Sequence, residues 1–147
     1  MATKTRDNVF SEEERAAVAA TARERKSTGK LTPEQERAAG LQDLQDSLAK
    51  MPPDDRAMGE RIHEIVTAAR PDLSPKTYYG MPASAIDGKT IAFYKAKSKF
   101  RVRYSTFGFQ PDAHLDDGKI WPTEFAVIEL TPAVEKQLAD LVKKAAG

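Results

Sequence analysis

The residues best suited to hold a metal ion lie in the segment PDAHLDDGK, residues 111–119. Here His114 is close in sequence to three carboxylates, those of Asp112, Asp116 and Asp117. An imidazole and carboxylates together are suitable ligands for iron, manganese or magnesium. The spacing matches neither an EF-hand loop nor a zincin helix, and Asp-Asp-Gly is also common in surface turns. The segment is therefore a candidate metal site, with a solvent-exposed turn as the alternative.

A second candidate site is a run of cations, because residues 89–110 contain several lysines and arginines but no acidic residue. Alternation along KFRVRY (99–104) predicts that Lys99, Arg101 and Arg103 project from one face of a strand, and Phe100, Val102 and Tyr104 from the other. Nucleic-acid binding by stacking calls for aromatic side chains on the same face as the cations. The pattern therefore favours a solvated or edge-protecting face, with phosphate binding as the alternative. The candidate anion ligands are Lys97, Lys99, Arg101 and Arg103.

The segment YYGMP (78–82) is a candidate small-ligand site. Gly80 can adopt a positive φ, and the following proline holds Met81 extended, so the segment predicts a strand, a sharp turn and a new strand. Adjacent tyrosines in a strand point to opposite faces, so Tyr79 with Met81 could line a groove. Trp121, the only tryptophan, could stack on a ligand or close the core. Taken alone, the segment favours a structural bend over a binding site.

Nothing in the sequence indicates a catalytic nucleophile. The chain has no cysteine, which excludes a thiolate, a zinc ribbon and a disulfide. It contains no Gly-x-Ser-x-Gly elbow and no phosphate-cradling glycine loop. Of the two histidines, His63 lies on the flank of its predicted helix, where a surface contact is more typical than a catalytic base. The net charge of +1 favours neither polyanions nor cations as partners, so a charged partner needs a local patch.

The predicted order of elements, helices followed by a run of strands and then a last helix, is typical of an α+β protein. Helices are predicted from Thr32 as an N-cap to about residue 50, from about Asp54 onwards, and from Thr131 towards the C-terminus. Between the last two lie short β-favouring runs, KTYYG, PASAI, KTIAFYKA, KFRVRYSTF and EFAVIEL, with turn signals at 87–88 and 117–118. The connections are too short for crossover helices. We expect a two-layer sandwich, with an antiparallel sheet of four to five strands and two helices on one face.

The first fifty residues differ in character from the rest. Their apolar content is thin, although Ser11 and Glu14 form a capping-box pattern, so residues 1–50 are predicted to be a helical N-terminal extension and residues 51–147 the α+β domain. The N-terminus has no apolar signal region, and no stretch of about 18 apolar residues occurs. These observations predict a soluble cytoplasmic protein without membrane contact.

The segment YYGMPASAIDGKTIAFYKAKSKFRVRY resembles the YdhG-like domain of unknown function, whose members carry an aromatic-Gly-Met-Pro turn followed by a Gly-Lys hairpin. The resemblance extends over roughly residues 52–146. It implies a compact domain similar to the frataxin-like fold, some relatives of which are described as iron chaperones for cluster or haem assembly. Frataxin-like iron binding is attributed to an acidic ridge on the first helix and the adjoining strand. Here only Glu60 and Glu64 clearly share an outward face of that helix, and neighbouring arginines dilute their field.

The resemblance leads to an expected function: a small non-enzymatic binding protein, of the iron-chaperone type, whose partner is iron or an iron-using assembly protein. The iron ligands would be Glu60, Glu64, His114, Asp116 and Asp117. Two alternatives stay open. One is a protein or nucleic-acid interaction module that uses the basic hairpin, and the other is an enzyme with a small-ligand pocket around Tyr79, Met81 and Trp121.

Overall fold

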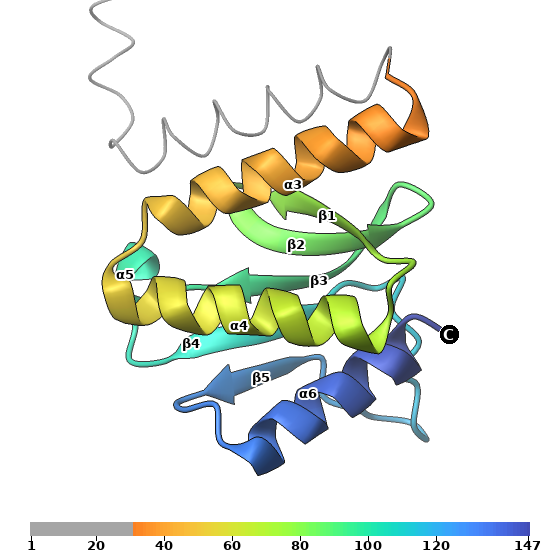
Figure 1. Ribbon diagram of the computed structural model, residues 1–147. Coiled ribbons are helices and arrows are strands. Elements are labelled where there is room, and N and C mark those ends of the chain that lie inside the picture. Colours follow the sequence, from red (N-terminus) through yellow and green to blue (C-terminus); the bar gives the residue numbers. More distant parts are fainter. Residues whose placement is uncertain (1–30) are drawn as a thin grey trace, which may run out of the picture.

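The computed structural model describes residues 31–147, which form a five-stranded antiparallel sheet and four helices (Figure 1). The strands follow one another across the sheet in chain order. In sequence the elements are α3 (Pro33–Ala49), α4 (Pro53–Ala69), β1 (Ser74–Tyr78), β2 (Met81–Ile86), β3 (Lys89–Lys95), α5 (Lys97–Phe100), β4 (Ser105–Phe109), β5 (Glu124–Val127) and α6 (Pro132–Ala145). The predicted α+β class and antiparallel sheet are confirmed.

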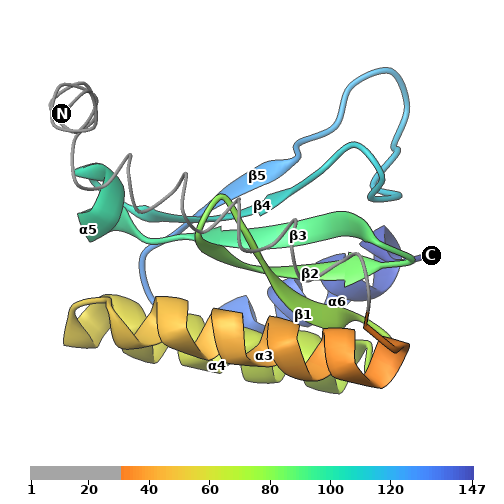
Figure 2. The same cartoon turned by 90° about the horizontal axis from the view of Figure 1, so that it is seen from above.

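Three long helices lie on the same face of the sheet. Figure 2 shows α3, α4 and α6 in one layer beneath the strands, with the β4–β5 connection rising on the other side. The sequence predicted two helices in this layer. None of the helices within residues 31–147 has the length and apolar character needed to cross a membrane.

Two tight turns set the register of the first three strands. Tyr79 and Gly80 have φ values of 49° and 78°, and they join the paired residues Tyr78 and Met81. The segment 87–88 repeats this geometry between β2 and β3, with φ values of 51° and 78°. Positive φ at both central residues is the mark of the two-residue hairpin whose twist matches the strands. The predicted strand-turn-strand segment and the predicted hairpin at 87–88 are confirmed.

The helices begin at the capping residues that the sequence predicted. Thr32 Oγ1 accepts a hydrogen bond from Gln35 N at 3.2 Å, and Gln35 Oε1 accepts one from Thr32 N at 3.0 Å, which completes a capping box before α3. Thr131 Oγ1 accepts from Val134 N at 3.2 Å at the start of α6. Both α3 and α6 have proline in the first turn, where the missing N–H costs nothing. Local sequence therefore determines where these helices start.

The packed unit formed by the sheet and its helices begins earlier in the chain than the predicted boundary at residue 50. Helix α3 packs along β1 and β2, and it buries Leu44 and Leu48. At Gly40 its backbone lies so near β1 that a Cβ atom would overlap the carbonyl group of Pro75. Residues 33–49 thus belong to the packed unit. The other part of the predicted extension, with its helix start at Ser11, lies outside the residues that the structure describes.

Apolar side chains fill both faces of the central strands. Alternation places Tyr94 on the helix side, where its hydroxyl reaches α4, and Phe93 on the opposite side. On the helix side the buried cluster includes Ile62, Val66, Tyr94, Phe107, Leu138 and Val142. On the opposite side the cluster is Met81, Ala83 and Phe93, with Tyr78 packed against it.

Candidate anion-binding site at α5

Helix α5 is a single turn in the β3–β4 connection, and one buried carboxylate holds it in place. Asp55, in the first turn of α4, is only 1% exposed. Its Oδ1 accepts from Lys97 Nζ at 3.1 Å, and its Oδ2 accepts from Ser98 N at 3.1 Å. The hydroxyl of Tyr94 donates to the carbonyl oxygen of Asp55 at 2.8 Å. Asp55 therefore ties the α5 segment and β3 to the start of α4.

The charge of Asp55 is stabilised despite its burial. Burial alone would raise the pKa of the carboxyl, because it removes the ionised form from water. The hydrogen bonds from Ser98 and Lys97, with the positive charge of Lys97, outweigh that effect and hold the pKa below its ordinary value. At neutral pH Asp55 is ionised and neutralises Lys97, so Lys97 is a structural cation rather than a free anion ligand.

The predicted strand across residues 99–104 is wrong. Residues 97–100 are helical, and Arg101 ends the turn in the left-handed region with φ 53°. The next strand starts only at Ser105. Consequently Lys99, Arg101 and Arg103 do not alternate along a strand, and the predicted separation of cations from aromatic residues does not hold.

The structure instead brings cations and aromatic rings together at this end of the sheet. Lys95 Nζ lies 5.0 Å, and Lys99 Nζ 5.7 Å, from the centroid of the Phe100 ring. Phe100 is 39% exposed. The guanidinium carbon of Arg103 lies 5.4 Å from the centroid of the Tyr104 ring. We name the surface formed by Lys50, Lys95, Lys99 and Phe100 the α5 patch; the pair Arg103 and Tyr104 follows it in the connection to β4.

The cations of the α5 patch crowd one another. Burial, and then the charge of Lys50, lower the pKa of Lys99 below its ordinary value. Figure 1 shows α5 beside the junction of α3 and α4, where Lys50 lies. Within residues 31–147, none of Lys50, Lys95, Lys99 and Arg103 forms an ion pair with a carboxylate. The patch is therefore a local excess of positive charge around an exposed ring.

The five residues predicted as metal ligands do not form a cluster. Glu64 Oε2 accepts from Arg61 Nη1 at 2.8 Å, and the same guanidinium binds Glu135 at 2.8 Å. Glu60 is exposed on α4. His114 lies in the β4–β5 connection with Asp116 and Asp117, and its backbone N donates to the carbonyl of Ala145 at 2.8 Å. In the part of the chain that the structure describes, no three His, Asp or Glu side chains are placed to hold a metal ion.

The residues predicted to line a small-ligand pocket lie on different surfaces. Tyr79 is 56% exposed at a hairpin tip. The rings of Tyr78 and Tyr79 meet edge to face, 4.7 Å between centroids, so the prediction that they point to opposite faces is wrong. The reason is the positive φ of Tyr79, which ends the strand alternation. Met81 packs with the cluster around Phe93, whereas Trp121 packs against the helix-side cluster.

No family model, curated protein or solved structure matches this chain. The YdhG-like resemblance and the iron-chaperone function that it implies stay predictions from the sequence.

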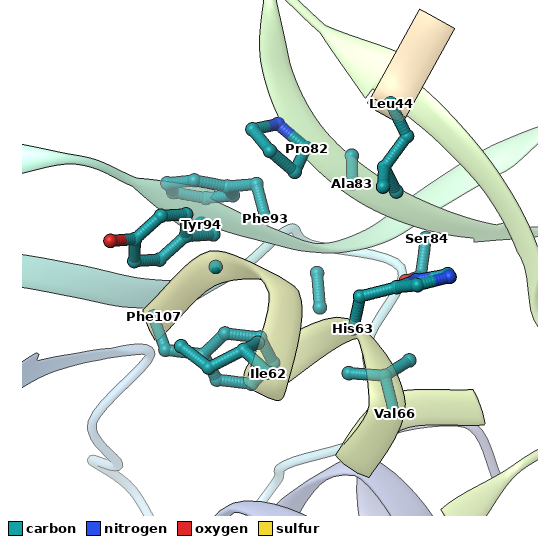
Figure 3. A pocket seen from close by; sticks show the side chains of 12 residues that line it. Leu44, Ile62, His63, Val66, Pro82, Ala83, Ser84, Phe93, Tyr94 and Phe107 are labelled. Carbon is teal, nitrogen blue, oxygen red and sulfur yellow. The ribbon is translucent and has the colours of Figure 1, made fainter. Parts of the chain in front are cut away.

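A small cavity lies between α4 and the sheet (Figure 3). Its volume is about 20 Å³, enough for one water molecule but not for a substrate. His63 and Ser84 contribute polar atoms to a lining that is otherwise mostly apolar. Burial, assisted by the charge of Arg37, lowers the pKa of His63, against the opposing effect of Glu64. His63 is therefore partly enclosed rather than a surface residue, and its environment favours the neutral imidazole.

Sequence reasoning identified the cations at this end of the sheet but missed the side chains that organise them. Nothing in the sequence distinguishes Asp55 from its neighbour Asp54, and strand alternation predicted Phe100 on the opposite face from the cations. The sequence shows a run of six cations without an acidic residue, so a carboxylate that pairs with any of them must come from elsewhere in the chain. Which carboxylate forms such a pair depends on the tertiary fold.

Proposed function

We propose that the protein is a non-enzymatic binding module whose α5 patch binds single-stranded nucleic acid. The observation that carries the proposal is the exposed ring of Phe100 with Lys95 and Lys99 beside it, at 5.0 and 5.7 Å. Single strands are bound by this combination of a stacking ring and backbone-neutralising cations, and stacking tolerates any base. The surface is small, and it fits one base with the phosphates on either side of it.

Charge supports the same proposal. Lys99 is partly buried beside Lys50, which raises the free energy of the patch when no anion is bound. A phosphate bound between these lysines would relieve their repulsion, so part of the binding free energy comes from removing the repulsion that is present in the free protein. Because the net charge of the whole chain is only +1, attraction is confined to the patch. We therefore expect a dissociation constant on the order of 10⁻⁴ to 10⁻⁶ M, strongly dependent on salt.

Fluorescence anisotropy with a labelled oligothymidylate of about twelve nucleotides tests the proposal. With two phosphates contacted, the logarithm of the binding constant should fall with the logarithm of the salt concentration with a slope of about −1.4. Phe100→Ala should weaken binding about tenfold, since stacking contributes about 1–3 kcal/mol per base. Lys99→Ala should weaken it about fivefold and make the slope shallower.

Lys89→Ala is the matched control, because Lys89 begins β3 at the end opposite to α5 and is exposed. It removes the same charge and should change binding less than about twofold. Binding that is absent at low salt, or that Phe100→Ala and Lys89→Ala reduce equally, would contradict the proposal.

A further inference from the structure

The two edges of the sheet are protected very differently. β1 carries Pro75 and Lys76 and is packed against α3, and both features discourage pairing with another strand. β5 has the sequence EFAV, with neither proline nor lysine. It pairs with β4 on one side, and no strand within residues 31–147 pairs with its other side. β5 is thus the edge at which another chain can be added.

The backbone groups of β5 that face outward can be identified from the register. Phe109 N donates to Thr123 O at 2.8 Å, and Phe107 pairs with Phe125. Since hydrogen-bonding direction alternates along an antiparallel strand, Phe125 and Val127 also turn their backbone groups towards β4. Glu124 and Ala126 therefore turn theirs outward, where they can bind an incoming strand.

Beneath this edge lies an apolar groove. It runs between β5 and α6 and has a volume of about 420 Å³. Figure 1 shows the first turns of α6 lying beyond the edge of β5. A strand added to β5 would pass over this part of the helix, and every second side chain would point into the groove. The apolar residues that line the groove are Phe125, Ala126, Val127, Val134, Leu138 and Leu141, and Gln137, Asp140 and Lys144 of α6 complete the lining.

The charges beside the groove indicate what kind of strand fits. Glu124 begins β5, and Glu129 lies two residues beyond its last residue, Val127; both glutamates are exposed, and neither forms an ion pair within residues 31–147. Ile128 between them is 74% exposed. A second copy of this chain, paired antiparallel about Ala126, would bring Glu124 of each copy close to Glu129 of the other. Like charges at both ends oppose that pairing, whereas lysine or arginine at those positions would neutralise the carboxylates.

We propose that β5 and α6 bind an extended peptide segment of a partner protein, which extends the sheet antiparallel to β5. Its residues on the helix side are apolar, and its ends are basic. Main-chain hydrogen bonds to Glu124 and Ala126 provide affinity, and the groove selects the alternate side chains. This site is separate from the α5 patch and makes the protein a module with two binding surfaces.

The test uses the full chain and a synthetic peptide of about seven residues, with lysine at both ends and valine alternating with threonine between them. In ¹⁵N-edited NMR titrations, amides of β5 and α6 should shift, and those of α5 should not. Ala126→Pro removes the outward N–H but leaves the ladder to β4 intact, and should weaken binding about tenfold. Ala126→Ser keeps the N–H and should bind as the unaltered chain does.

A second peptide provides a test that does not depend on whether the proline variant folds. It has the same sequence with N-methyl groups on the residues that pair with Ala126, and it should bind the unaltered protein about tenfold more weakly. A peptide with glutamate at both ends should also bind more weakly. Three results would each overturn the proposal. The first is that the methylated peptide binds as tightly as the unmethylated one, and the second is that no β5 amide shifts up to about 5 mM peptide. The third is self-association through β5 that the peptide does not reverse.

Discussion

Replacing Asp55 by asparagine tests how the α5 segment is held. The substitution keeps the size of the side chain but removes the charge that accepts from Lys97 Nζ and Ser98 N, each at 3.1 Å. An amide also has an NH₂ group, which would face one of these two donors. Because Asp55 is fully enclosed by the start of α4 and by α5, that mismatch has no room to relax.

The expected loss of stability follows from these contacts. A hydrogen bond to a charged group contributes about 1.5–3 kcal/mol, and two are affected. Lys97 is 41% exposed and Ser98 is at the surface, so water replaces part of what both donors lose. The carboxylate also no longer has to be desolvated, which offsets a further part. We expect Asp55→Asn to lower the free energy of unfolding by about 2 kcal/mol at pH 7.

Urea unfolding, followed by Trp121 fluorescence and by circular dichroism, measures the effect. Asp54→Asn is the matched control, because Asp54 is the residue next to Asp55 and its side chain is exposed. This substitution should change the free energy of unfolding by less than about 0.5 kcal/mol. The pKa of Asp55 is lowered in the fold, so its contribution is complete above the ordinary value of 3.8 and is lost as the pH falls below it. The difference between the variant and the unaltered chain should therefore shrink below about pH 4. Equal stabilities of the two variants, or a difference that is the same at pH 7 and pH 3, would refute this account of Asp55.

Three further predictions concern the packing of α3 and the small cavity. Thr32→Ala should lower stability by about 1 kcal/mol, because α3 loses its N-cap hydrogen bond; thermal unfolding would show this, and an unchanged midpoint would contradict it. Gly40→Ala should destabilise by about 2 kcal/mol, although alanine favours helix by about 1 kcal/mol, because the new methyl group overlaps the Pro75 carbonyl; a stabilised variant would disprove the close approach. His63 has a lowered pKa, so its contribution to stability is complete above 6.5 and is lost as the pH falls below that value. His63→Gln should remove this part of the pH dependence, and an NMR titration midpoint of His63 above 6.5 would contradict the burial effect.

Features set by neighbouring residues were predictable from the sequence. The capping box at Thr32, the start of α6 at Thr131 and the hairpin at 87–88 each depend on residues within four positions of one another. The chemistry of such turns and caps is local, so no knowledge of the fold is needed to recognise it.

Features that depend on distant residues were not predictable in the same way. The α5 turn replaces the expected strand because Asp55, 43 residues before Ser98, accepts its backbone N–H. Helix α3 belongs to the packed unit although only two of its leucines are buried, because Gly40 lets its backbone approach β1. The separate extension was predicted from the small number of apolar residues, and that number gives no information on how closely two backbones approach.

The candidate site shows the same division. The excess of cations in residues 89–110 was visible in the sequence, but the separation of cations from aromatic rings was inferred from strand alternation. The α5 turn brings Lys95, which ends β3, and Lys99, which lies in α5, onto the Phe100 ring, and Arg101 ends this turn in a left-handed conformation that nothing in its residue type indicates.

The order of the strands also has a consequence for how the protein folds. Every strand pairs with its neighbour in sequence, and β1, β2 and β3 are joined by turns of only two residues. Closing such short loops loses little chain entropy, so these three strands can assemble early. β5 joins the sheet only after the connection from Gln110 to Thr123 is ordered, and α6 follows it in the chain. The edge to which we assign peptide binding is thus the part of the sheet expected to form last and to open first.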